Sequence, residues 1–298
     1  MVGEPSPLDA GDSVVALDGA LETTAVDSTL SDDSPPIVDA TDSDADALDA
    51  PVTEASVGCA GKKGAKMVEL TVDGTYRYCI DTTEVTNAQF REFIEAPGEP
   101  YEAPPTCPSK SDDAGYRRPS PVSEASEKNK PVHRGVTWCF AYAYCKWAGK
   151  RLCGKIGGGP STSASNLSSE WTFACANGRD ENPFPYGDTY DKARCNTDPV
   201  PGEVFSATVD VASKTGCHGL KAPHDAIFDM SGNVGEYEDQ IEAHATPLPS
   251  QTLRGGWAGS VNYADAGGAS VQCDVTAIPF GIATDAFEDV GFRCCADP

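Results

Sequence analysis

The sequence contains no Cys-x-x-Cys pair, only four histidines and no long run of apolar residues. Structural zinc sites are built from closely spaced cysteine pairs or from clusters of cysteine and histidine, so a zinc-stabilised domain is not expected. A helix that crosses a membrane needs about 20 mostly apolar residues in a row. The apolar runs here are far shorter, so the sequence predicts no transmembrane segment.

Lysine and arginine are absent from residues 1–57, which contain fourteen aspartates and glutamates and no aromatic residue. A segment of this composition cannot bury enough apolar surface to offset the entropy that ordering would cost. We predict that residues 1–57 form a disordered acidic tail or linker, with a folded acidic domain as the alternative. Residues 58–298 are then the globular domain.

The formal net charge of the chain is −24 and its pI is about 4.3. The negative field of such a protein repels the phosphates of nucleic acid, so no nucleic-acid partner is expected. Cations are attracted instead, and calcium in particular is bound by oxygen ligands.

Twelve cysteines are present, and all of them lie at or after Cys59. An even number, spread over the part of the chain that is expected to fold, is typical of a disulfide framework in an oxidising compartment. We therefore predict an extracytoplasmic protein, whether secreted, periplasmic or at the cell surface. No export signal is visible, and we expect one upstream of Met1 or already removed. Residues 57–59 weakly resemble a lipoprotein cleavage site, although no apolar segment precedes them.

The spacing of apolar residues predicts one hairpin and three helices. Apolar and polar residues alternate over residues 66–80 around the turn signal Asp73-Gly74, which indicates a hairpin. The helices are expected over residues 86–95, over residues 136–148, and from Ser168 or Ser169 to Cys175. Beyond residue 178 glycine and proline are frequent, which predicts short strands and turns.

Eight short motifs follow one another along the chain in a recognisable order. They are residues 78–90 (YCIDTTEVTNAQF), 136–138 (VTW), 143–152 (AYCKWAGKRL), 169–171 (SEW), 184–188 (FPYGD), 229–236 (DMSGNVGE), 254–257 (RGGW) and 291–294 (GFRC). Over residues 66–298 this series resembles the formylglycine-generating enzyme family, also called sulfatase-modifying factors. The resemblance implies an α+β fold, related to C-type lectins, with little regular secondary structure and with bound calcium.

Characterised members of that family oxidise a sulfatase cysteine to formylglycine, using copper(I), molecular oxygen and two thiols. The two copper cysteines of the family are five residues apart, just after the Arg-Gly-Gly segment. Here residues 254–266 contain neither cysteine nor histidine, and Gly259 or Ser260 and then Ala264 stand near the expected positions. Copper(I) prefers thiolates, which a serine hydroxyl cannot replace. We therefore expect no bound copper, and no catalytic residue is assigned.

Calcium ligands can be carried over from the resemblance onto the 229–236 motif. They would be the side chains of Asp229 and Glu236 and the carbonyls of Gly232 and Val234. Glu84 matches another calcium ligand of the family, and Asn196 matches a residue of a second calcium site. The alternatives are a tight turn with exposed carboxylates at 229–236 and, for Glu84, a charge that is favoured near a helix N-terminus.

The resemblance also implies two disulfides, Cys145–Cys294 and Cys175–Cys273. A third, Cys195–Cys217, is expected because its cysteines are close in the sequence. Cys79, Cys139, Cys153 and Cys295 are expected to form two more among themselves, in undetermined pairs, while Cys59 and Cys107 pair with each other or stay free. The adjacent Cys294 and Cys295 need separate partners, since a ring between them would be strained.

Trp257, Ser260 and Tyr263 lie in the segment that would line the substrate groove of the family. Exposed aromatic side chains there would favour contact with a peptide or a glycan, whereas buried ones would be core, which we expect for Trp257. The leading hypothesis is a non-copper binding or accessory module with an unknown protein, peptide or glycan ligand. The alternatives are an oxidase with relocated metal ligands and a purely structural surface protein.

Overall fold

The structure is a computed structural model that describes residues 58–97, 107, 125–161, 168–198, 207–240, 250–251, 253–261, 267–275, 280–282 and 287–298. Residues 1–57 lie outside these ranges, so the acidic tail and its boundary at residue 58 stay predictions. Tyr263 also lies outside them. Among the described residues, no helix is long and apolar enough to cross a membrane.

The predicted hairpin is confirmed, and it consists of β1 (Met67–Val72) and β2 (Tyr76–Asp81) in antiparallel register. Its turn contains Asp73 and Gly74, both with positive φ angles. Side chains alternate between the two faces of a strand, so the apolar residues of both strands can face the interior together.

The three predicted helices are also confirmed, as α1 (Asn87–Glu95), α2 (Trp138–Trp147) and α3 (Glu170–Cys175). Each begins after a hydroxyl side chain that accepts a backbone N–H of the first turn: Thr86, Thr137 and Ser169, respectively. Short 3-10 turns occur at Ala125–Glu127, Gly178–Asp180, His224–Ala226 and Ala269–Val271.

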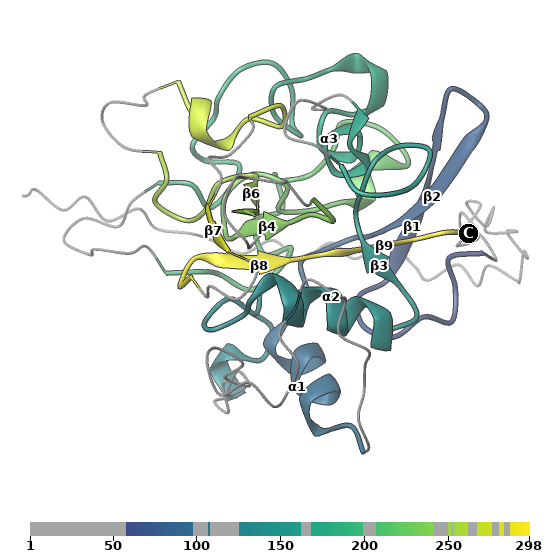
Figure 1. Ribbon diagram of the computed structural model, residues 1–298. Helices are drawn as coiled ribbons and strands as arrows, with labels where there is room; N and C mark the ends of the chain where they lie inside the picture. The colour runs from purple at the N-terminus through teal and green to yellow at the C-terminus, as the bar shows by residue number, and fades with distance from the viewer. Residues whose placement is uncertain are drawn as a thin grey trace, which may run out of the picture. The chain divides into compact units, whose positions relative to one another are not determined.

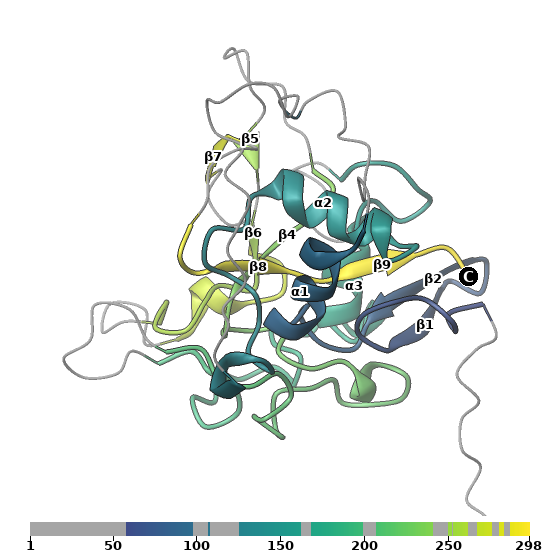
Figure 2. The same cartoon turned by 90° about the horizontal axis from the view of Figure 1, so that it is seen from below.

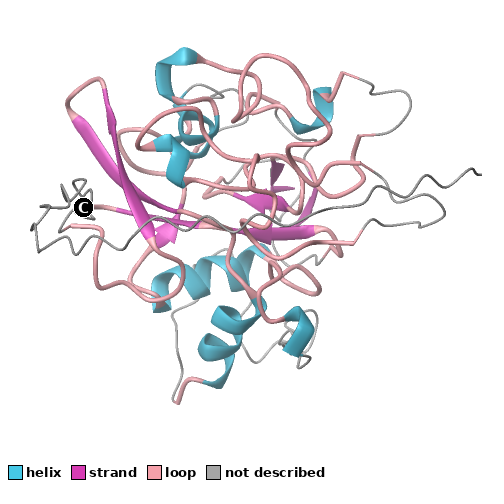
Figure 3. Cartoon of the chain, turned by 180° about the vertical axis from the view of Figure 1, so that it is seen from behind, coloured by secondary structure: helices cyan, strands magenta, loops and turns pink. Residues whose placement is uncertain are grey.

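Three small sheets account for the strands among the described residues, and loops make up most of the remainder (Figure 3). A four-stranded sheet has the order β1-β2-β9-β3 and a three-stranded sheet the order β6-β4-β8, while β5 pairs with β7. The strands not yet given are β3 (Arg151–Leu152), β4 (Gly235–Tyr237), β5 (Ser250–Gln251), β6 (Leu253–Arg254), β7 (Phe280–Ile282), β8 (Val290–Phe292) and β9 (Cys294–Ala296). The protein therefore has the expected α+β fold with little regular secondary structure.

Strands β8 and β9 follow one another and connect the two larger sheets. Helices α1 and α2 lie on one side of the line that these strands form, and α3 lies on the other (Figure 1). The first core cluster includes the aromatic rings of Phe90, Tyr144 and Phe292, which contact one another. A second cluster, which includes Trp171 and Phe173, packs beneath the hairpin. The C-terminus lies beside the hairpin (Figure 2).

All twelve cysteines are described, and all are paired. The six disulfides are Cys59–Cys79, Cys107–Cys139, Cys145–Cys294, Cys153–Cys295, Cys175–Cys273 and Cys195–Cys217. The structure thus contains the three bonds that were expected by name. The adjacent Cys294 and Cys295 have separate partners, as steric strain requires.

The pairing of the other cysteines corrects two expectations. Cys79 bonds Cys59 and not Cys139, Cys153 or Cys295, with which it was grouped. The reason is that β2 lies next to β9 and residue 58 packs against the C-terminal Pro298. Cys139, in the first turn of α2, bonds Cys107, so Cys59 and Cys107 are neither free nor paired with each other. The sulfur of Cys59 is in a disulfide, so the structure gives no support to the lipoprotein interpretation of residues 57–59.

Candidate functional site: a buried carboxylate cluster and an emptied copper segment

The motif at residues 229–236 forms a tight loop that leads into β4. Asp229 and Asn233 both adopt the left-handed region, with φ angles of 59° and 61°, as does Gly232 with 78°. A Cβ atom at Gly232 would lie 2.7 Å from Cγ2 of Thr197 and 2.8 Å from the carbonyl carbon of Asn196. Glycine is therefore required here for both its backbone angle and its size.

Asn233 is the centre of this loop, and it joins three distant parts of the chain. Its amide nitrogen donates to Oε1 of Glu84 at 3.1 Å. Its amide oxygen accepts from Nδ2 of Asn196 at 3.1 Å and from the backbone N–H of Val209 at 3.0 Å. Glu84 and Asn196, which were expected at different metal positions, thus converge on the same loop.

Glu236 is buried and fully engaged by neighbouring side chains. Its Oε1 accepts from Nη2 of Arg293 at 2.6 Å, and its Oε2 accepts from Nε of Arg293 at 2.7 Å and from Nε1 of Trp171 at 2.8 Å. A bidentate arginine and an indole N–H satisfy both oxygens. Protein groups therefore engage both oxygens of Glu236.

Glu84 and Asp229 are the two acids of the cluster that do not form the ion pair with Arg293. Both are buried, and burial is the main reason why the pKa of Asp229 rises to about 6 and that of Glu84 rises well above its usual range. The neighbouring carboxylates raise the pKa of Glu84 further, while Arg293 opposes the shift. Oε2 of Glu84 is buried and has no hydrogen-bond partner among the described residues. When ionised, the three acids carry more negative charge than the one arginine balances, so a further cation would be favoured there.

The residues fit a calcium ion only in part. Asp229 Oδ2 already accepts the backbone N–H of Ala212 at 2.6 Å, and Glu236 is committed to Arg293. Within the described ranges, no group of three His, Cys, Asp or Glu side chains is arranged to hold a metal. Calcium also takes backbone carbonyls, so Glu84, Asp229 and the carbonyls of Gly232 and Val234 are the donors that could hold it.

Sequence reasoning missed a second buried cluster, built around Glu238. Ser169, the cap of α3, donates to Oε1 of Glu238, and Nε of Arg254 donates to its Oε2 at 2.7 Å. Arg254 and Arg293 both come from motifs that carried the family resemblance. The sequence did contain a sign of these two Glu–Arg pairs. Glu236 and Glu238 are two residues apart, so their side chains lie on the same face of an extended segment.

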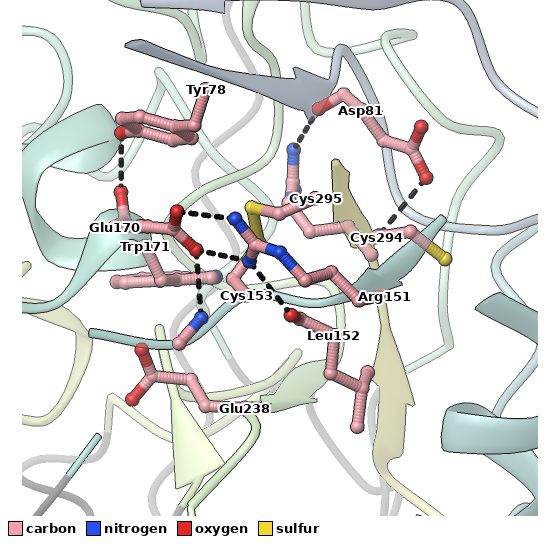
Figure 4. Close-up of a disulfide and its surroundings, with 12 residues drawn as sticks. Tyr78, Asp81, Arg151, Leu152, Cys153, Glu170, Trp171, Glu238, Cys294 and Cys295 are labelled. Carbon is pink, nitrogen blue, oxygen red and sulfur yellow. Dashed lines mark hydrogen bonds and ion pairs between the residues drawn. A yellow bond between two sulfur atoms is a disulfide. The ribbon is translucent and has the colours of Figure 1, made fainter. Parts of the chain in front are cut away.

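A third cluster surrounds Glu170 at the start of α3. Both carboxylate oxygens accept from the guanidinium of Arg151, at 2.6 and 2.7 Å, and Oε2 also accepts the backbone N–H of Gly154 at 2.8 Å. Figure 4 shows Arg151 turned toward Glu170, beside the disulfide that joins Cys153 to Cys295. These hydrogen bonds hold the start of α3 against β3, and both carboxylate oxygens of Glu170 accept at least one of them.

The segment that would bind copper in the family is a compact turn here. Ser260 Oγ donates to the carbonyl of Trp257 at 2.7 Å and accepts the backbone N–H of Trp257 at 3.2 Å. The carbonyl of Thr197 accepts the N–H groups of Gly259 and Val261. Trp257 is half-buried, so it is not the core residue that we expected. The hydroxyl of Ser260 therefore stabilises the turn. The predicted groove is untested, because Tyr263 lies outside the described residues.

The family model of the sulfatase-modifying factor enzyme 1-like domain matches residues 60–298. The chain belongs to this family. A bovine (Bos taurus) relative, inactive C-alpha-formylglycine-generating enzyme 2, is 28% identical over 194 residues, which cover 61% of this chain and 56% of the relative. Mouse (Mus musculus) formylglycine-generating enzyme is 26% identical over 275 residues, which cover 76% of this chain and 67% of that enzyme. The chain thus spans little more than half of the bovine protein.

Among solved structures, the protein named CarF is similar with a TM-score of 0.47 and 18% identity. The alignment covers 80% of this chain and 98% of CarF. Of the two curated relatives, the mouse protein is named as an enzyme and the bovine protein is named as inactive. The residues of this chain must indicate which of the two it resembles.

Proposed function

We propose that this protein is a non-copper member of the family, an extracytoplasmic binding or accessory module rather than an oxidase. One observation carries the proposal: the segment at residues 254–261 offers no thiol, and all twelve cysteines are held in disulfides. Copper(I) needs soft ligands, and no thiolate is available to it in this oxidised protein. The relative that is named inactive shows that loss of activity occurs within the family.

The extracytoplasmic location rests on the six disulfides. A reducing cytosol would break such a framework, whereas secreted, periplasmic and cell-surface proteins keep it. The ligand of the module would be a protein, peptide or glycan that meets the surface around Trp257 and Ser260. A half-buried tryptophan is a common anchor at binding surfaces, since it supplies a large contact area with little loss of conformational entropy.

The oxidase is tested directly by incubating the full chain with copper(I), a thiol reductant, oxygen and a peptide that carries the sulfatase motif. We expect no formylglycine by mass spectrometry, while an active formylglycine-generating enzyme converts the same peptide. Alkylation of the unfolded but unreduced protein gives an independent readout, and we expect no labelled cysteine. Conversion above the buffer rate, together with two labelled cysteines, would show that relocated ligands support the oxidase.

We also propose that calcium stabilises the 229–236 loop. The support is the excess of buried carboxylates at Glu84 and Asp229 over the single charge of Arg293. A divalent cation would ionise both acids and take up the unused oxygen of Glu84. Chelation should therefore lower the melting temperature of the wild-type protein, and added calcium should restore it.

The matched variant is Glu84→Gln, which keeps the shape of the side chain and its contact with Asn233 but removes the charge. Its melting temperature should depend much less on calcium than that of the wild type. An equal response of both proteins to chelation would place the calcium elsewhere. No response in the wild type would contradict a stabilising ion at any site, and it would leave the non-copper proposal standing.

A further inference from the structure

A lysine and an aspartate face each other in the interior, and no function described so far uses them. Nζ of Lys150, between α2 and β3, lies 2.6 Å from Oδ1 of Asp81 at the end of β2. Both side chains are completely buried. The same nitrogen donates to the carbonyl of Ala65 at 2.9 Å. The amine is therefore held against the carboxylate, with no bulk water to compete for either group.

The second oxygen of Asp81 is fixed by the backbone. The N–H of Cys294 donates to Oδ2 at 2.9 Å, as the dashed line between the two residues in Figure 4 shows. This bond leaves the Oδ1 side of the carboxylate facing Lys150. It also places a donor where negative charge on Oδ2 would be stabilised during attack at Cγ, as in an oxyanion hole.

A buried hydroxyl stands beside the pair. Oη of Tyr144 and Nζ of Lys150 both lie within 4 Å of the point where a Cβ of Gly64 would stand. Oη of Tyr144 is buried and has no hydrogen-bond partner among the described residues. Burial is the main cause of the raised pKa of Tyr144, and the negative charge of Asp81 adds to it. The hydroxyl is not hydrogen-bonded to the pair, so a role in proton transfer would need a water molecule between them.

We propose that Lys150 and Asp81 condense into an intramolecular isopeptide bond. One ammonium proton first moves from Nζ to Oδ1, and the Nζ lone pair that this frees attacks Cγ of Asp81. The Cγ–Oδ1 bond then breaks, and an Nζ–Cγ amide forms. Two protons of the ammonium leave with Oδ1 as one molecule of water. Atoms and charge balance, since a carboxylate and an ammonium give a neutral amide and water without any oxidant or co-reactant.

Two physical effects favour this reaction at this place. The fold holds nucleophile and electrophile in contact, so the entropy of bringing them together is lost once, on folding. Burial penalises both charges, and the amide removes both of them. The chain contains a natural control for the second effect. Lys221 and Asp180 are 2.5 Å apart, but their side chains are 56% and 45% exposed, so burial does not penalise their charges in the same way.

The test is the mass of the full chain after all disulfides have been reduced and alkylated. We expect the measured mass to be one water molecule below the mass that the sequence gives. Proteolysis should yield a branched peptide that joins Asp81 to Lys150, and trypsin should no longer cleave after Lys150. The Asp180 and Lys221 peptides should be separate. A full sequence mass, or a lost water that maps to another residue, overturns the proposal.

Two variants refine the test. Lys150→Arg keeps the positive charge, but arginine is a far poorer nucleophile. This variant should have the full mass that its sequence gives, and a lost water in it would contradict the bond.

Tyr144→Phe keeps the ring in the core and removes the hydroxyl. The linked fraction should grow more slowly in this variant after refolding, and an unchanged rate would exclude Tyr144 as the proton relay. The mapped wild-type peptides decide the proposal even if a variant does not fold.

Discussion

Gly232 shows how closely single residues are fitted together in the 229–236 loop. Its φ angle of 78° belongs to the left-handed region, and the space beside its Cα is filled by Asn196 and Thr197. Both requirements point to glycine, but they differ in origin: one is a property of the backbone, and the other is a property of the neighbours.

The substitution Gly232→Ala separates these requirements when it is compared with Gly61→Ala. Gly61 has the same φ of 78°, yet nothing lies within 4 Å of the place that its Cβ would occupy. We expect Gly61→Ala to cost about 1 kcal/mol, from backbone strain alone. Gly232→Ala should cost roughly 2–4 kcal/mol, because overpacking is added. Urea unfolding measures both, and equal losses would contradict the clash.

Residue types were easier to predict from the sequence than their partners. Glu84 and Asn196 were predicted as calcium-site residues, and the structure brings both to Asn233. That meeting could not be predicted, because Glu84 and Asn233 are 149 positions apart and no local periodicity connects them. Calcium at this loop stays a proposal for the same reason, since the donors of a site come from several segments.

Among the elements, β4 is held by charges as well as by backbone pairing. It lies between β6 and β8, and its Glu236 pairs with Arg293, which follows β8. Both side chains are essentially buried. Removing one partner of such a pair leaves the other charge buried without compensation.

The substitution Arg293→Met tests the contribution of the buried Glu236–Arg293 pair. We expect it to lower the free energy of unfolding by about 3–5 kcal/mol, because Glu236 would be left charged and unpaired. Arg179→Met is the matched control, since Arg179 and its partner Asp73 are 51% and 58% exposed. That change should cost less than about 1 kcal/mol. Chemical unfolding of both variants measures the difference, and similar losses would refute the assigned role of burial.

Helices and the hairpin were predictable as elements, whereas the short strands were not. A capping residue such as Thr86 followed by a 3.6-residue apolar period marks a helix within one local window. Strands such as β4 and β8 have three residues each, too few for an alternation to stand out. Their pairing is parallel and links Glu236 to Gly291, so it depends on the path of the whole chain.

At the scale of the whole molecule, the buried acids make stability depend on pH. Asp229 has a pKa of about 6 instead of 3.8, mainly because of burial. In calcium-free buffer the folded state therefore binds this proton more readily than the unfolded state between about pH 4 and pH 6. Through this group, stability should fall as pH rises across that window.

The variant Asp229→Asn removes this titration, because asparagine does not titrate, and it also removes the charge of Asp229 that helps to raise the pKa of Glu84. The stability of the variant minus that of the wild type should increase from about pH 4 to about pH 6 and then level off. The buried His133 and His224 have lowered pKa values and oppose the trend, but they are common to both proteins and cancel in the difference. Unfolding measured in chelator across this range provides the test, and a constant difference would contradict it.

By itself, the sequence determined the family, the capped helices, the hairpin and the presence of a disulfide framework. These features depend on residue types at short spacing or on their order along the chain. Only the tertiary structure decided that Cys59 bonds Cys79, that Cys107 bonds Cys139, and that Glu84 reaches the 229–236 loop. Such pairings require distant segments to lie within a few ångströms, and that proximity is created when β9 returns beside β2 and the core closes.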